Sequence, residues 1–146
     1  MKTTEILKPK TESEIWESLA RLSTNLLLFT SARAGFITGV EKALEQGADI
    51  DYFIDFCGKT ALAAASEEGQ FHVVKYLLDR DASVCDISLI GAFERMDLFT
   101  MMLERVNVKE CEGLRLALEV AEGEDKFEIA HQIHERIKQG WFHFCK

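Results

Sequence analysis

The feature that most constrains the fold of this chain is an internal repeat with an offset of 34 residues. Residues 25–50 align with residues 59–84 without a gap. A repeat of this period is one supersecondary unit that cannot bury its apolar face alone, so neighbouring units must stack. The identical pairs are Leu28/Leu62, Gly35/Gly69, Val40/Val74, Leu44/Leu78 and Ala48/Ala82.

Each copy of the repeat predicts two short helices joined by a glycine turn. In the second copy, Thr60 can cap a first helix of small residues, and Gly69 ends it as a left-handed C-terminal residue does. Phe71, Val74 and Leu78 then recur at the spacing of one apolar helix face. The first copy has the same pattern, with Gly35 at the break and an apolar face of Ile37, Val40 and Leu44.

Residues 58–84, which read GKTALAAASEEGQFHVVKYLLDRDASV, resemble the ankyrin repeat and its TPLHLAA..G...VV.LL..GAD pattern. The segment from Gly47 to Ile50 resembles the closing turn of that repeat. The chain departs from the family at Ala61 and Ala63, which stand where the family has Pro and His. The family's His supplies a hydrogen bond that ties neighbouring loops together, and this chain lacks it. The resemblance implies an all-α solenoid of helix–turn–helix repeats with capping helices at both ends.

Apolar stripes with helical spacing extend beyond the two matched copies. A capping box of Thr11 and Glu14 starts a helix at the N-terminal end, and its apolar side is expected to shield the stack. Gly123 separates the last two stripes. The four stripes are Ile15, Trp16, Leu19 and Leu22; Leu98, Met101 and Met102; Leu114, Ala117, Leu118 and Ala121; and Ile129, Ala130, Ile133 and Ile137.

These patterns predict one ankyrin-repeat-like domain over residues 11–139. The third repeat is expected to be shortened, because its turn-to-turn spacing leaves room for little of the loop that separates the first two. The expected parts are a flexible N-terminus (1–10), a cap helix (11–22), repeats at about 25–57, 58–84, 85–110 and 111–139, and an aromatic tail (140–146).

Charge and cysteine content narrow the functional classes. The chain has 17 Lys and Arg against 25 Asp and Glu, a net charge of −8, which disfavours nucleic acid and anionic membrane as partners. No apolar run is long enough for membrane insertion, and the first ten residues do not read as a signal peptide. The four cysteines form no CxxC pair, a usage typical of reduced thiols, so we expect a cytoplasmic protein.

Catalysis is not expected from this sequence, and neither is a cofactor or a bound metal. None of the common phosphate-binding, dinucleotide-binding, hydrolase or metalloprotease motifs is present. The best candidates for a site are His131 and His134, three residues apart on a helix, with His143 and Cys145 near the end. These residues could in principle hold zinc, or serve a metal- or thiol-dependent enzyme, but they lack the tight spacing of a zinc finger. We therefore interpret the histidines as surface residues.

The loop between the two matched repeats, residues 51–59, is the most informative local feature, and we name it the finger loop. It stands where the family has its β-hairpin finger, and it contains Tyr52, Phe53, Ile54 and Phe56. Two interpretations are open: these side chains pack inward against the neighbouring loop, or some of them form an exposed apolar contact surface. The tail carries Trp141, Phe142 and Phe144, and it either closes the last helix pair or is exposed for a partner or for self-association.

The resemblance implies non-covalent protein binding, as an adaptor, an inhibitor or a targeting protein. An alternative is a secreted effector of an intracellular bacterium or a virus that acts on a host protein, delivered into the host cytosol. Ankyrin repeats hold partners with their fingers and their concave face. Carried over by position, the binding residues are Tyr52, Phe53, Phe56 and Lys59 in the finger loop, and Arg33, Glu67 and Glu68 along the groove.

Overall fold

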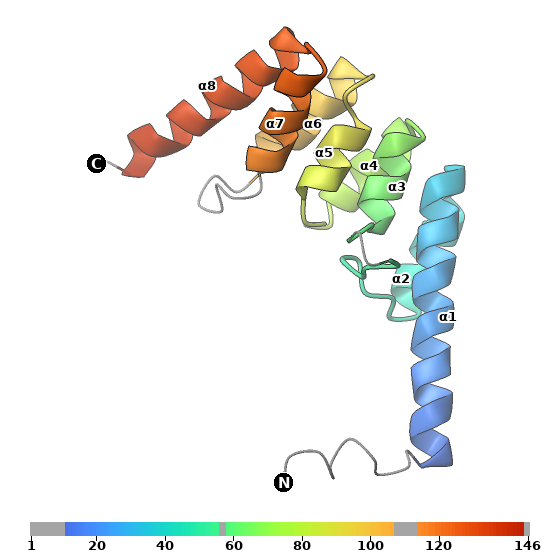
Figure 1. The fold of residues 1–146 in the computed structure, drawn as a ribbon. Helices are drawn as coiled ribbons and strands as arrows, with labels where there is room; N and C mark the ends of the chain where they lie inside the picture. Colours follow the sequence, from blue (N-terminus) through green and yellow to red (C-terminus); the bar gives the residue numbers. More distant parts are fainter. Residues whose placement is uncertain (1–10, 56–57, 107–113, 145–146) are drawn as a thin grey trace, which may run out of the picture.

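A computed structural model describes residues 11–55, 58–106 and 114–144, and every element in those residues is a helix. The helices follow one another in a curved row, with α1 at one end and α8 at the other (Figure 1). The fold is therefore all-α, as the resemblance implied. The elements are α1 (Glu12–Ala34), α2 (Ile37–Glu45), α3 (Ala61–Glu67), α4 (Phe71–Leu78), α5 (Asp86–Gly91), α6 (Met96–Arg105), α7 (Arg115–Gly123) and α8 (Phe127–Phe144).

Helix α1 begins at the predicted capping box and runs on without a break into the first repeat. The Glu14 amide donates to the Thr11 hydroxyl at 3.3 Å, and the Thr11 amide donates to the Glu14 carboxylate at 3.0 Å. The structure has one continuous helix over Glu12–Ala34 in place of the separate cap helix predicted at 11–22. No Gly or Pro lies between Leu22 and Asn25 to end the helix.

The N-terminal half of α1 extends past the repeats, so it does not shield them (Figure 1). Leu22 and Leu26 are exposed, whereas Leu28 and Ala32 are buried in the core. At the other end of the chain, α8 continues to Phe144, so the predicted tail is helical up to that residue. No helix breaker other than Gly140 interrupts this stretch, and a single glycine is tolerated inside a helix. The expected flexible segment 1–10 lies outside the described residues.

Two helices form each unit, and a turn with a left-handed residue joins them in three of the four units. Gly35 and Gly69 take φ values of 80° and 72°, as the sequence predicted. In the last unit the left-handed residue is Asp125, with φ of 56°, whereas the predicted break at Gly123 is the final residue of α7. Asp is one of the few residues other than glycine that adopt this conformation readily.

The inner helix α3 packs closely against its neighbours because its side chains are small. All residues from Ala61 to Ser66 are buried. The Ser66 hydroxyl donates to the Ser88 carbonyl of α5 at 2.8 Å and lies 2.9 Å from the Ala63 carbonyl, so this buried polar group is satisfied. At Gly91 of α5, an added Cβ would stand 3.2 Å from the Glu67 backbone nitrogen, which shows how near the two backbones are.

The outer helices bury the predicted stripes, with one exception. Val74 and Leu78 are buried as expected, together with Val73, which the stripe did not include. Phe71 is instead 43% exposed, because it is the first residue of α4 and lies at the edge of the stack. In the later units the core includes Leu98, Met102, Leu114, Ala117, Ala121, Ile129, Ala130 and Ile133, with Met101, Leu118 and Ile137 packed partly buried against it.

Polar side chains connect each unit to the one before it, at both ends of the helices. At the turns, the Gln70 amide donates to the Arg33 carbonyl and the Arg95 guanidinium to the Glu67 carbonyl, each at 3.2 Å. At the opposite ends, Arg105 donates to the Leu78 carbonyl at the end of α4. Arg136 of α8 donates to the Leu103 and Glu104 carbonyls at the end of α6, at 3.2 and 2.9 Å. Carbonyls at a helix C-terminus lack partners within the helix, and a cation is favourable there.

Gly39→Ala tests how tightly α1 and α2 are packed. An added Cβ at position 39 would lie 2.8 Å from the Cβ of Ser31, which is buried in α1. We expect the substitution to lower the free energy of unfolding by about 1–3 kcal/mol, because neither backbone can move away freely. The matched control is Gly123→Ala, where the added Cβ meets no atom within 4 Å. That variant should be unchanged or more stable by up to about 1 kcal/mol, through helix propensity alone. Urea denaturation compares the two, and equal stabilities would contradict the packing.

Candidate protein-binding surface

The finger loop is closed by its own backbone and by Asp55. The Ile54 amide donates to the Lys59 carbonyl at 3.0 Å, and the Lys59 amide donates to the Asp55 carboxylate at 3.0 Å. Gly58 has a φ of 75°, the left-handed conformation that the turn requires. The described part of the loop contains no strand, so it is a hydrogen-bonded turn and not the β-hairpin that the family pattern suggests.

Side-chain hydrogen bonds tie the loop to its neighbours although the family's histidine is missing. The Asp51 carboxylate accepts from the Ser83 amide at 2.8 Å and from the Ser83 hydroxyl at 2.7 Å. Two residues before Asp51, the Asp49 amide donates to the Asn25 side chain of α1 at 2.8 Å. These bonds attach the start of the finger loop to α1 on one side and to the segment after α4 on the other.

Of the aromatic residues in the finger loop, Phe53 is the one that the structure places on the surface. Its side chain is 60% exposed, whereas Tyr52 and Ile54 are half-buried. The Phe53 ring and the Ile87 side chain both border Gly58, so the loop rests against the start of α5. Phe56 lies outside the described residues. The structure thus combines the two interpretations, with part of the loop packed inward and one aromatic ring exposed.

The four charged candidates form two ion pairs across the inner side of the stack. The Arg33 Nε lies 3.3 Å from a Glu68 carboxylate oxygen, which joins the end of α1 to the end of α3. Lys59, before α3, pairs with Glu67 at its last turn. All four side chains are at least partly exposed, and such pairs contribute little stability individually. They therefore place charges of both signs on the surface, and separating the paired side chains costs little free energy.

The comparison with known protein families finds one recognised repeat in this chain. The family model for the ankyrin repeat matches residues 57–88, the span that contains α3 and α4. The similarity to the family is thus shown for this one repeat. Ankyrin repeats are protein-interaction modules and are typically non-catalytic. No curated protein matches the chain closely enough to count as a relative.

The two described histidine candidates, His131 and His134, belong to no metal-binding cluster among the described residues. His131 and His134 are exposed on α8, and the His134 Nε2 lies 3.4 Å from a Glu122 carboxylate oxygen. Within the described residues, no group of three His, Cys, Asp or Glu side chains is placed to hold a metal ion. The His143 side chain and Cys145 lie outside what the structure describes.

No described helix is both long and apolar enough to cross a membrane.

Sequence reasoning missed a buried carboxyl group beside the finger loop. Asp86 is the first residue of α5, next to Ile87, and its Oδ1 is buried with no hydrogen-bond partner among the described residues. This burial raises the pKa of Asp86 to about 6. The sequence carried no signal for it, because an acidic residue in the first turn of a helix is ordinarily solvated and favourable. The exposure of Phe127, two residues before the last apolar stripe begins at Ile129, was also not predicted.

Asp86→Asn should make the stability of the ankyrin stack less dependent on pH. The folded state binds the Asp86 proton more tightly than the unfolded state, so stability is highest when the carboxyl is protonated. That contribution is present below about pH 4 and is lost as pH rises through 6. At pH 7.5 we expect the variant to be more stable by about 1 kcal/mol, a value reduced by solvent screening of a partly accessible group.

The check is urea denaturation of both proteins between pH 4 and pH 7.5. The difference between them should shrink as the pH falls. A variant that is less stable than the wild type at pH 7.5 would mean that the ionised carboxylate is favourable in this position.

Proposed function

We propose that this chain is a non-catalytic adaptor, inhibitor or targeting protein that binds a protein partner. The binding surface is the finger loop together with the inner side of the stack beside α3. The observation that carries the proposal is the exposed Phe53 ring on a loop fixed at both ends by hydrogen bonds. An aromatic side chain held in this way loses little conformational entropy on binding, and aromatic anchors contribute much of the energy at interfaces.

The charged residues along α3 support a partner with both acidic and basic groups. Arg33 and Glu68 present one pair of opposite charges, and Lys59 and Glu67 present a second pair. A partner with complementary charges can replace these exposed pairs with its own. Such complementarity contributes mainly to specificity and to the rate of association.

The proposed surface around the finger loop and α3 lies in the first half of the chain. Residues 46–60 join α2 to α3, whereas only residues 79–85 join α4 to α5, so the next connection has no loop of comparable length. A partner therefore contacts the finger loop and the inner side of the stack beside α3, with no second loop of this length at the next connection. We propose a cytoplasmic location, which agrees with the free thiol of Cys85.

Phe53→Ala should weaken partner binding by about 1–3 kcal/mol while the helical content stays the same. The matched control is Phe71→Ala, because Phe71 is also an exposed phenylalanine but lies at the turn after α3, away from the finger loop. The partner is first captured from cell lysate with the wild-type protein and identified. Its affinity for the wild type and both variants is then measured by titration calorimetry, with circular dichroism as the folding check.

Loss of affinity in Phe53→Ala alone supports the proposed surface. Equal loss in both variants, or unchanged affinity in Phe53→Ala, would rule out the finger loop as the anchor. Unfolding of Phe53→Ala would assign the ring to the core. In that case the affinity of Arg33→Glu, which changes an exposed residue, tests the same surface through its charge.

A further inference from the structure

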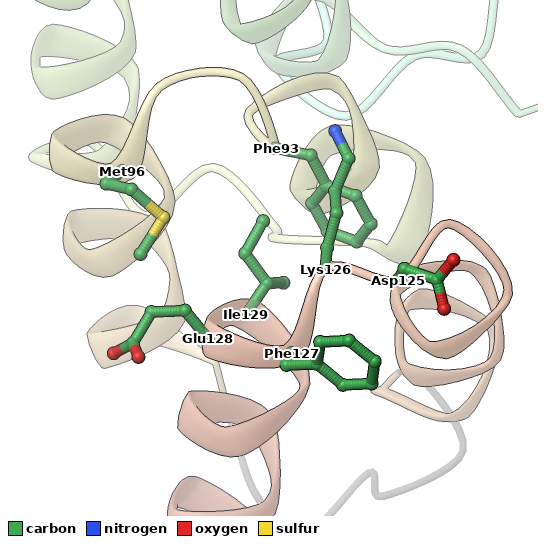
Figure 2. Close-up of a pocket in the computed structure, with 7 residues that line it drawn as sticks. All are labelled: Phe93, Met96, Asp125, Lys126, Phe127, Glu128 and Ile129. Carbon is green, nitrogen blue, oxygen red and sulfur yellow. The ribbon is translucent and has the colours of Figure 1, made fainter.

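A second apolar surface lies in the other half of the molecule, at the turn between α7 and α8. It is an open pocket with a volume of about 440 Å³. Phe93 and Ile129 are buried. Ile129 lies between Met96 and Phe127, and the Phe93 ring lies next to Lys126 (Figure 2). Phe127 is 73% exposed, more than any other large apolar side chain among the described residues. A pocket of this size accepts one large side chain.

The pocket is held in shape by contacts between units. Lys126 forms ion pairs with Glu94, in the turn between α5 and α6, and with Glu124. The Lys126 ammonium also lies 5.7 Å from the centre of the Phe93 ring. The hydrogen bond between Lys126 and Glu94 raises the pKa of the lysine and lowers the pKa of the glutamate, so both stay charged near neutral pH. Lys126, the only cation among the described residues that line the pocket, is therefore paired with two carboxylates.

The remaining charge around the pocket is negative. The Asp125 and Glu128 carboxylates lie on opposite sides of the Phe127 ring in Figure 2. The Asp125 side chain has no hydrogen-bond or ion-pair partner among the described residues, whereas its backbone amide donates to the Glu122 carbonyl. The Glu128 carboxylate accepts a hydrogen bond from Gln132 at 3.5 Å. The two turn segments next to the pocket, 94–97 and 122–128, together contain six carboxylates and two basic residues.

The backbone at Asp125 adds a second observation. Its φ of 56° is the conformation that Gly35 and Gly69 adopt at the corresponding turns. Asp125 thus takes the place that glycine has in the first two units, and it adds a carboxylate to the residues that line the pocket.

We propose that this pocket binds a protein segment that presents one large apolar or aromatic side chain flanked by Lys or Arg. The apolar side chain would lie between Phe127 and Met96, over Phe93 and Ile129. The flanking cations would face Asp125 and Glu128. This surface is separate from the finger loop, so the chain has two binding surfaces in different repeats.

The test uses the full chain labelled with ¹⁵N and three synthetic peptides, acetyl-KKFKK-amide, acetyl-EEFEE-amide and acetyl-KKAKK-amide. Amide signals are followed by nuclear magnetic resonance during each titration. We expect KKFKK to shift signals of residues 93–96 and 125–129, with an affinity at least tenfold higher than that of the other two peptides. Raising the salt concentration from 50 to 500 mM should weaken this binding at least threefold, because exposed charges are screened.

Variants then assign the contacts. Phe127→Ala should weaken KKFKK binding at least fivefold, and the double variant Asp125→Asn with Glu128→Gln at least threefold. The matched control is Phe71→Ala, the residue at the same position two helix pairs earlier, which should bind KKFKK as the wild type does. The peptide comparison on the wild type needs no variant, so it decides the matter even if Phe127→Ala does not fold.

Several results would overturn the proposal. Equal binding of KKFKK and KKAKK would mean that the pocket takes no apolar side chain, and equal binding of EEFEE would remove the role of the carboxylates. If millimolar KKFKK shifts no amide signals, the pocket is not a binding site for such a segment. If the free protein is a dimer that Phe127→Ala converts to a monomer, the occupant is a second copy of the chain and not a partner segment.

Discussion

The close packing of α3 between α1 and α5 is the interaction on which the rest of the structure depends. Six consecutive small or apolar residues of α3, from Ala61 to Ser66, are buried, so the helix is a spacer between two backbones. Such packing leaves no room for larger side chains, and a volume change in a close-packed interior is destabilising. The finger loop enters α3 at one end and the turn at Gly69 leaves it at the other. Both are therefore positioned by the same short helix.

The polar contacts between units have a different role, because they fix each helix pair in register with its neighbour. Gln70 and Arg95 reach back to the preceding turn, and Arg105 and Arg136 reach back to the preceding helix C-terminus. An added Cβ at Gly35 or Gly69 would lie within 2.5 Å of Gln70 or Arg95, so these glycines also make room for the side chain from the next unit. Each unit is thus completed by the one that follows it, which is why the stack gains its stability cooperatively.

Sequence periodicity predicted the faces of the helices well but not their edges. The repeat at an offset of 34 residues identified the turns at Gly35 and Gly69, and the apolar spacing identified most of the core. Periodicity reports which side of a helix is apolar, but it does not tell how far along the helix the neighbour extends. Phe71 and Phe127 are exposed for this reason, since each begins a helix at the edge of the stack. The continuity of α1 and the buried Asp86 carboxyl depend on contacts between distant segments, which no local pattern records.

The two surfaces differ because the connections between repeats differ in length. The long connection between α2 and α3 leaves room for a loop that presents Phe53, and ion pairs of both signs lie along the helix that follows it. The short connection between α4 and α5 leaves no such loop, and the most exposed large apolar side chain in the described second half, Phe127, lies at the turn between α7 and α8. One surface has mixed charge and the other is acidic, so they favour different partner segments. A small stack of this kind can therefore hold two segments at once, with the rigid packing of the inner helices keeping them apart.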